Sequence, residues 1–190
     1  YVEKWYGEKM NRWSRERTVS IALAKDGKSE AMSGLLKITR EEQIPLWRAA
    51  AVNLLKRWYF RPEAQKAILA ASEDTASIVR GIAARSLEPI AGDKENLANA
   101  ALTRLLNDNS RSVRVQAAWS LRSSIDTNST AGKELIEYMK YNSDQPAGLL
   151  QIGVFYFDRG ESDKAIDALK KAISWETNSA PLHYALAICY

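Results

Sequence analysis

Apolar residues recur along most of the chain at the three- and four-residue spacing of an amphipathic helix. No segment shows the sustained alternation of a half-buried strand, and no Asn-Gly or Asp-Gly pair joins two β-branched runs. Pro45 and Pro62 are placed to begin helices, where the missing N–H costs nothing. The pattern predicts an all-α chain with helices over 2–25, 29–40, 45–60, 62–72, 76–88, 94–107, 111–125, 130–142, 146–159, 162–176 and 180–190.

Part of this pattern is repeated within the chain. Residues 74–80 align with residues 108–114, 34 positions further on, and a looser copy around Arg48 lies 32 positions upstream. Such spacing is typical of repeat proteins, in which each helical hairpin packs on the next. The match continues at small and apolar positions, namely Ala51, Leu55, Ala83, Ala84, Leu87, Ala117, Ala118 and Leu121.

These residues resemble the second helix of HEAT repeats, D-x-x-x-x-V-R-x-x-A-A-x-x-L, closely over 72–125 and more loosely over 29–60. The valine, alanines and leucine fall on one stripe of the helix, where small residues let neighbouring helices approach. The aspartate can accept backbone N–H groups at the start of its helix. The resemblance implies an Asp–Arg ladder from repeat to repeat, with structural roles for Asp74, Arg80, Asp108 and Arg114.

A second pattern begins at Pro146 and resembles the tetratricopeptide (TPR) repeat. Gly160 occupies the turn, and a second, truncated copy begins at Ala180. We predict that Gly153 and Ala165 are small because two helices touch there, and Ala172 because the next hairpin packs on it. The matching positions are Leu149 in place of the usual Trp, then Ile152, Gly153, Tyr156, Ala165, Leu169 and Ala172.

Together the two resemblances imply a right-handed α–α superhelix (solenoid) of antiparallel helical hairpins. We expect an N-terminal helical cap over 1–28, carrying Trp5, Tyr6 and Trp13, and HEAT-like repeats over 29–125. TPR repeats follow over 146–190. Between them, 126–145 reads as an adaptor helix with Leu135, Ile136 and Met139 facing inward. Because the chain begins at Tyr1 and ends at Tyr190 within a helical pattern, we interpret it as part of a longer protein.

The net charge of +4 is unevenly spread. Residues 1–61 contain 13 Lys/Arg and 7 Asp/Glu, whereas the rest contains 14 and 16. Segments 12–17 and 56–61 interleave aromatic and basic residues, which is one pattern for nucleic-acid binding. The mixed acidic residues and the helical spacing of the aromatics disfavour that alternative. No run approaches the roughly 18 apolar residues of a membrane-spanning helix, so we expect no membrane insertion.

Residues suited to catalysis are sparse. His183 and Cys189, six positions apart, lie on different helix faces, and His183 occupies a TPR packing position. The sequence contains no Gly-rich phosphate loop, H-E-x-x-H or G-x-S-x-G motif. A single cysteine also excludes an internal disulfide. We therefore expect no enzymatic activity, cofactor or metal in this fragment.

The TPR resemblance implies a protein or peptide partner bound on the concave face, which the first helix of each hairpin lines. An apolar, aromatic groove suits an extended or helical peptide. Leu150 and Val154 could instead simply pack against further repeats. The predicted partner-binding residues are Leu150, Val154, Phe157, Asp158, Tyr184 and Ile188.

The N-terminal segment 2–7, with Trp5, Tyr6 and Gly7, followed by both repeat types, is similar to the C-terminal region of bacterial multihaem c-type cytochromes. In those proteins a related segment follows the last C-x-x-C-H haem site, and this chain contains no such motif. The similarity implies an exported, periplasmic parent protein in which this fragment docks a partner or a neighbouring subunit.

Overall fold

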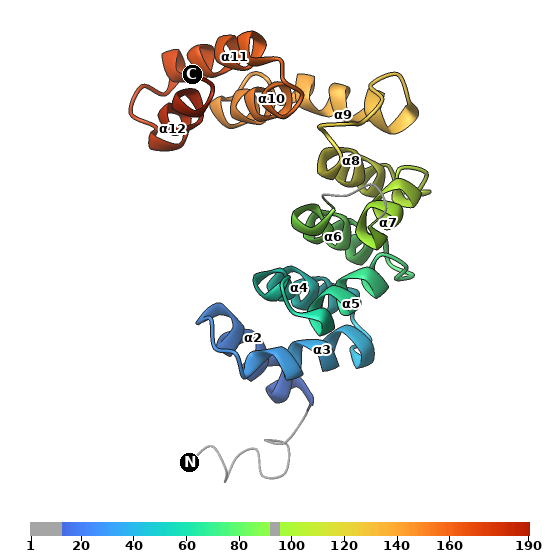
Figure 1. Cartoon of the computed structure of the whole chain (residues 1–190). Coiled ribbons are helices and arrows are strands. Elements are labelled where there is room, and N and C mark those ends of the chain that lie inside the picture. The colour runs from blue at the N-terminus through green and yellow to red at the C-terminus, as the bar shows by residue number, and fades with distance from the viewer. Residues whose placement is uncertain (1–12, 92–95) are drawn as a thin grey trace. The chain divides into compact units, whose positions relative to one another are not determined.

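The computed structural model describes residues 13–91 and 96–190 (Figure 1). Within these residues the chain is all-helical, with 11 α-helices, 74% helix and no strands, as the sequence predicts. The chain divides into two compact units, unit 1 over Tyr1–Gln116 and unit 2 over Ala117–Tyr190. The four-segment division proposed from the sequence stays a prediction, and residues 2–7 lie outside the described part.

The helix bounds follow the predicted ones closely. Proline begins α4, α5 and α10, and Asn96 and Ser129 cap α7 and α9 by accepting the amides of Ala98 and Gly132. The α-helices are α2 (Trp13–Lys25), α3 (Ala31–Glu41), α4 (Pro45–Leu55), α5 (Pro62–Ala71), α6 (Ser77–Leu87), α7 (Leu97–Leu105), α8 (Arg111–Ser120), α9 (Thr130–Tyr141), α10 (Pro146–Asp158), α11 (Ser162–Trp175) and α12 (Ala180–Ile188).

Three of the helices predicted from the sequence extend beyond the ends of the observed α-helices. The segment 45–60 is α-helical to Leu55 and then tightens into a 3₁₀ turn, η2 (Lys56–Trp58). Helix α6 is likewise followed by η3 (Glu88–Ile90). Helix α8 ends at Ser120, and the buried Ile125 lies beyond it, after a turn. Tightened turns are common at helix ends, and apolar periodicity alone does not reveal them.

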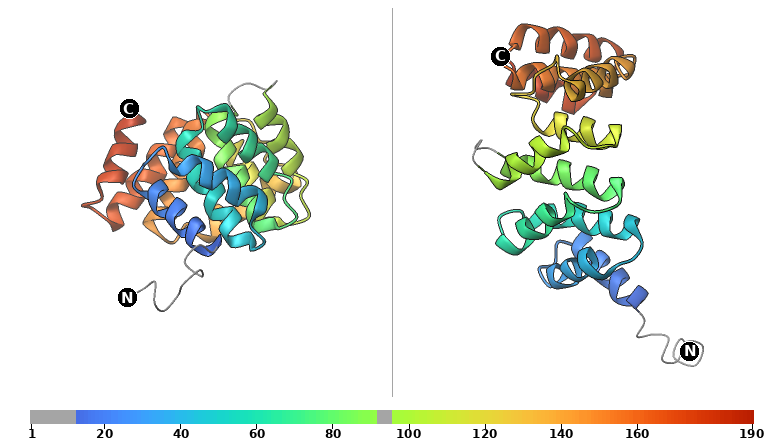
Figure 2. Two further views of the ribbon diagram at one scale, coloured as in Figure 1. Left: turned by 90° about the horizontal axis from the view of Figure 1, so that it is seen from below. Right: turned by 90° about the vertical axis from the view of Figure 1, so that its right-hand side faces the viewer.

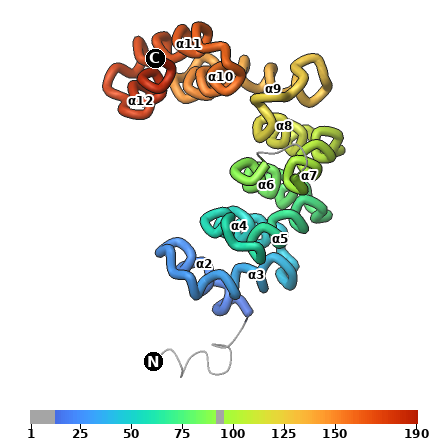
Figure 3. The backbone as a smooth tube through the Cα atoms, in the orientation of Figure 1, coloured from blue at the N-terminus to red at the C-terminus, as the bar shows by residue number. Residues whose placement is uncertain are grey.

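In unit 1 the helices pack in two rows. Helix α5 contacts α3 and α7, whereas α4 contacts α6, and neighbouring helices along the chain also contact each other. Helix α2 packs against both α3 and α4. Figures 2 and 3 follow this order of helices from blue to green. The alternation arises because short turns bring each helix back beside its predecessor.

The predicted apolar stripe forms the core of these helices. Val79 and Val113 are at most 1% exposed, so both aligned segments place their valine inward. The alanines at the repeated positions are fully buried, which lets α4 and α6 approach each other closely. The prediction of a buried stripe is confirmed at Ala51, Leu55, Ala83, Ala84, Leu87, Ala117, Ala118 and Leu121.

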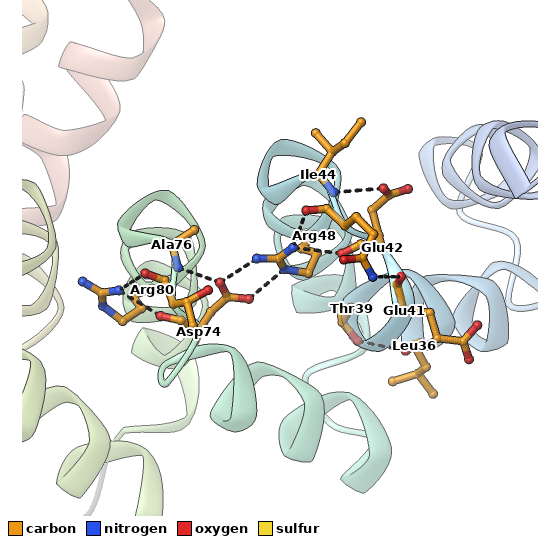
Figure 4. Close-up of polar contacts among 11 residues, drawn as sticks. Leu36, Thr39, Glu41, Glu42, Ile44, Arg48, Asp74, Ala76 and Arg80 are labelled. Carbon is orange, nitrogen blue, oxygen red and sulfur yellow. Dashed lines mark hydrogen bonds and ion pairs between the residues drawn. The ribbon is translucent and has the colours of Figure 1, made fainter.

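A ladder of arginine–carboxylate pairs connects successive turns of unit 1, and Figure 4 shows the pair of Arg48 with Asp74. Arg48 donates from Nε and Nη2 to the two oxygens of Asp74, each at 2.8 Å. Arg80 does the same to Asp108, at 2.6 and 2.9 Å. Each aspartate also accepts a backbone amide two residues on, from Ala76 or Ser110. The structural role predicted for these aspartates and for Arg80 is therefore confirmed.

The ladder has an earlier rung that the sequence analysis did not identify. Glu42 takes the aspartate's place: its Oε1 accepts the Ile44 amide at 3.0 Å, and its Oε2 accepts from Arg17 at 2.7 Å and from the Trp13 indole at 2.8 Å. The Arg17 guanidinium also lies 4.3 Å from the centre of the Trp47 ring. Trp13 of α2 thus contacts a buried carboxylate that follows α3, while its predicted role in an N-terminal cap stays a prediction.

The ladder sets the pKa values of its carboxylates. Burial raises the pKa of Glu42, but its hydrogen bonds from Ile44, Arg17 and Trp13 outweigh burial, and the net pKa is lowered. For Asp74, too, burial raises the pKa, but the hydrogen bonds from Arg48 and Ala76 outweigh burial, and the net pKa is lowered. The Arg80 hydrogen bond is the main cause of the lowered pKa of Asp108. All three carboxylates are therefore stabilised in the ionised form.

In unit 2, two close approaches position α9 and α10. A Cβ on Gly132 would lie 2.1 Å from the Asp126 carbonyl oxygen, and one on Gly148 would lie 1.8 Å from that of Asn142. Leu135 and Met139 face inward as predicted, but Ile136 is 37% exposed, because it lies at the edge of the buried stripe, about 100° around α9 from Leu135. Glycine at these helix starts lets the preceding turn fold directly against the helix.

Candidate partner-binding groove

Helices α10, α11 and α12 form the body of the candidate groove. Gly160, at φ 76°, makes the turn between α10 and α11, and its amide donates to the Phe157 carbonyl at 2.9 Å. Leu149, Leu169, Ala172 and Leu182 form a buried cluster shared by the three helices. The turn and the cluster together fix where the outward side chains of α10 and α12 lie.

Gly153 is a point of close approach between α10 and α11. A Cβ at this position would lie 2.7 Å from Cγ of Leu169, which is 1% exposed. The predicted close approach at Gly153 is therefore confirmed, and Ala165 and Ala172 are fully buried. Gly153 and Leu169 also line a hollow beside α10.

That hollow has a volume of about 120 Å³ and opens between α10 and α12. Val154 and Phe157 line it from α10, and Ile188 lines it from the end of α12. Phe157 and Ile188 are 37% and 49% exposed, so both present apolar surface to solvent. The remaining lining is also apolar, from Gly153, Leu169, Ala185 and Cys189.

The other three predicted site residues lie elsewhere. Leu150 packs against the buried cluster of α10, α11 and α12. Asp158 accepts a hydrogen bond from Arg122 Nε at 2.6 Å, while Arg159 donates to the carbonyls of Arg122 and Ile125, each at 3.0 Å. Tyr184 is 71% exposed on α12 and is not among the residues that line the hollow.

Asp158 therefore has a structural contact that its sequence position did not indicate. Its pair with Arg122 joins the turn after α8 to the end of α10, 36 residues further on. A carboxylate engaged in this way is less available to a ligand than a free one.

Cys189 is a lining residue that the sequence analysis treated only as a candidate for chemistry. Its thiol donates to the Ala185 carbonyl at 3.3 Å, and burial raises its pKa. The thiolate is the reactive form, so this cysteine is a weakly reactive apolar wall at neutral pH. Cys189 lies four residues after Ala185, so the two share one face of α12, and that spacing was the available signal.

His183 differs from its predicted packing role. It is exposed on α12, and its Nε2 lies 2.8 Å from the Thr177 carbonyl oxygen. This contact fastens the start of α12 to the turn before it. Within the described residues there is no group of three or more His, Cys, Asp or Glu side chains that could hold a metal ion.

No protein-family model, curated protein or solved structure matches the chain. Among the helices that the structure describes, none combines the length and apolar character needed to cross a bilayer. The geometry of the groove and the repeat patterns in the sequence are therefore the evidence on function.

Proposed function

We propose that the chain is a non-catalytic protein-interaction module that binds a partner or peptide through the groove between α10 and α12. The observation that carries this proposal is the apolar hollow lined by Val154, Phe157 and Ile188. A concave apolar site with partly exposed aromatic and aliphatic walls suits the side chain of a bound peptide. Tyr184, exposed beside it on α12, extends the contact surface.

The repeat patterns support the same proposal. The touching helices at Gly153 and the ladder through Asp74 and Asp108 are features that TPR and HEAT resemblances imply. We propose that the helices continue as a right-handed superhelix, in which the first helices of the TPR hairpins line a concave face. Repeat proteins commonly bind partners on such a surface.

Nucleic-acid binding by the basic N-terminal third is the alternative. Arginines of this region have intramolecular partners: Arg17 pairs with Glu42, Arg48 with Asp74, and Arg57 donates to the carbonyls at the end of α2. Arginines engaged in this way contribute less to phosphate binding. An affinity for DNA that falls at least about tenfold between low and moderate salt would favour the alternative.

The link to exported multihaem cytochromes stays a prediction, since segment 2–7 lies outside the described residues. We propose it as the setting in which this module docks a neighbouring subunit. Finding a C-x-x-C-H motif shortly before Tyr1 in the parent sequence would support it, and finding another kind of domain there would contradict it.

A peptide selection tests the proposed function. Random peptides displayed on phage are selected on the full chain, and an enriched, labelled peptide is then measured by fluorescence anisotropy. We expect Phe157→Ala to weaken binding about tenfold or more, as removal of a central aromatic contact does. Tyr184→Ala should weaken it less, because Tyr184 lies outside the hollow.

Trp175→Ala is the matched control, because Trp175 is a 49% exposed aromatic on α11 that does not line the hollow. Its affinity for the peptide should equal that of the unchanged chain. Equal binding by the Phe157→Ala variant would contradict the proposal. A large drop in its melting temperature would show instead that Phe157 belongs to the core.

A further inference from the structure

Unit 1 contains a second groove, which differs from the first in its charges. A hollow of about 380 Å³ lies between α3 and α5, lined by Leu36, Ala67 and Ala70 among others. A second hollow of about 380 Å³ lies between α5 and α7, lined by Ala70, Leu97 and Ala100 among others. Ala70 lines both hollows, so they adjoin, and we refer to them together as the α3–α5–α7 groove.

The shape of this groove follows from its residues. Ala70 and Ala100 are exposed but short, so they leave the space between neighbouring helices unfilled. Leu97, at the edge of the second hollow, is 72% exposed. Apolar surface of this kind is costly to leave in water, and its burial gains about 25 cal/mol per Å². The groove can therefore accept apolar side chains.

Two cations at the first hollow lack ion-pair partners. Arg40 makes one hydrogen bond, from Nε to the Leu36 carbonyl of its own helix, and Lys66 is exposed. Across the described residues, neither forms an ion pair, although Glu63 lines the same hollow. Three further charged residues of the groove are in ion pairs: Asp74 pairs with Arg48, and Arg104 pairs with Glu73.

We propose that the α3–α5–α7 groove docks an acidic amphipathic helix of a partner protein. Two adjoining hollows match a helix that presents apolar side chains at i, i+3, i+4 and i+7 on one face. Carboxylates beside that face would meet Arg40 and Lys66, the cations without ion-pair partners. The sequence of unit 1 adds a favourable field, with 20 Lys/Arg against 14 Asp/Glu over residues 1–116.

The groove is less suited to nucleic acid. Its lining is mainly apolar, and Glu63 and Glu73 lie among its charged residues. A phosphate backbone has no apolar side chains with which to bury the alanine surface, whereas an amphipathic helix does. DNA binding is therefore a measurable competing outcome for this site.

The test uses two synthetic helical peptides of about 18 residues, long enough to be partly helical alone. Both carry leucines at i, i+3, i+4 and i+7. One has glutamates beside the leucines, and the other has lysines. Fluorescence anisotropy with the full chain at low salt should show binding of the glutamate peptide and at least tenfold weaker binding of the lysine peptide.

Two changes to the chain examine the site itself. Ala70→Trp fills the point where the hollows meet and should weaken binding of the glutamate peptide at least tenfold. The double variant Arg40→Glu, Lys66→Glu should reverse the preference between the peptides. Ala22→Trp, at an exposed alanine of α2 that lines neither hollow, is the matched control and should bind like the unchanged chain.

The proposal would be overturned if the glutamate peptide did not bind, or if both peptides bound equally. Unchanged binding by the Ala70→Trp variant would also overturn it. So would tighter binding of a labelled DNA duplex, if Ala70→Trp weakened that binding too. Circular dichroism establishes that each variant is folded. Phe157→Ala should leave this binding intact, so failure here is distinct from failure of the groove between α10 and α12.

Discussion

In unit 1, successive turns are joined by arginine–carboxylate pairs, whereas in unit 2 α10 and α11 meet through apolar side chains at Gly153. The pairs of Arg48 with Asp74 and of Arg80 with Asp108 are both bidentate and largely buried. At Gly153, by contrast, the contact is with the buried Leu169. Neighbouring helices can therefore be held at a fixed spacing by different forces in the two units.

This difference has a consequence for stability. Directional hydrogen bonds make the spacing of unit 1 depend on ionised carboxylates, and hence on pH. Apolar packing in unit 2 depends instead on shape and volume. Substitutions chosen for each kind of contact should therefore affect the two units differently.

The largest expected effect comes from Leu169→Ala in unit 2. Leu169 is 1% exposed and fills the space beside Gly153, so its removal leaves a cavity. We expect a loss of about 2–5 kcal/mol in the free energy of unfolding. Hydrogen exchange should speed up mainly in α10 and α11, while α5 and α6 keep their protection. A uniform loss of protection in both units would contradict separate stabilisation.

The next largest effect is expected from Asp108→Ala in unit 1. This change removes both hydrogen bonds between Arg80 and Asp108 and leaves the Arg80 side chain, only 14% exposed, without its carboxylate. We expect a loss of about 2–3 kcal/mol, measured by denaturant unfolding. Glu73→Ala is the control, because its pair with Arg104 is well exposed and contributes little. Equal losses from both changes would refute the structural importance of the ladder.

A smaller effect is expected on acidification. The pKa values of Glu42, Asp74 and Asp108 are lowered on folding, so their contribution is present above the unfolded-state pKa of about 4 and is lost as pH falls through the folded-state values. Hydrogen exchange in α4 and α6 should therefore speed up before that in α10 and α11 between about pH 5 and pH 3. The Asp74→Asn variant should show a weaker pH dependence. If its pH profile equalled that of the unchanged chain, ionisation of Asp74 would not contribute to the stability of unit 1.

Sequence patterns predicted the helices well because their boundaries depend on local chemistry. Pro45, Pro62 and Pro146 begin helices in the structure, and Gly160 makes the predicted turn. The end of α8 at Ser120 could not be placed, because no glycine or proline interrupts the apolar pattern before the turn.

The contacts between distant residues were harder to predict. Glu42 was missed as a ladder residue because the repeat pattern calls for aspartate, although the six-residue spacing of Glu42 and Arg48 equals that of Asp74 and Arg80. The pairing of Asp158 with Arg122 depends on how the turn after α8 folds. Three of the six proposed binding residues line the hollow. The packing of α12 on α10 and α11 separates these three from the other three, and the sequence does not reveal that packing.

The most direct test of the proposed function is a methyl NMR titration of the full chain with a selected peptide. If the peptide occupies the groove between α10 and α12, the methyl signals of Val154 and Ile188 should shift most, because these residues line the hollow. Those of Val79 and Val113, buried in unit 1, should stay unchanged. Shifts confined to unit 1, with Val154 and Ile188 unaffected by a bound peptide, would contradict the account.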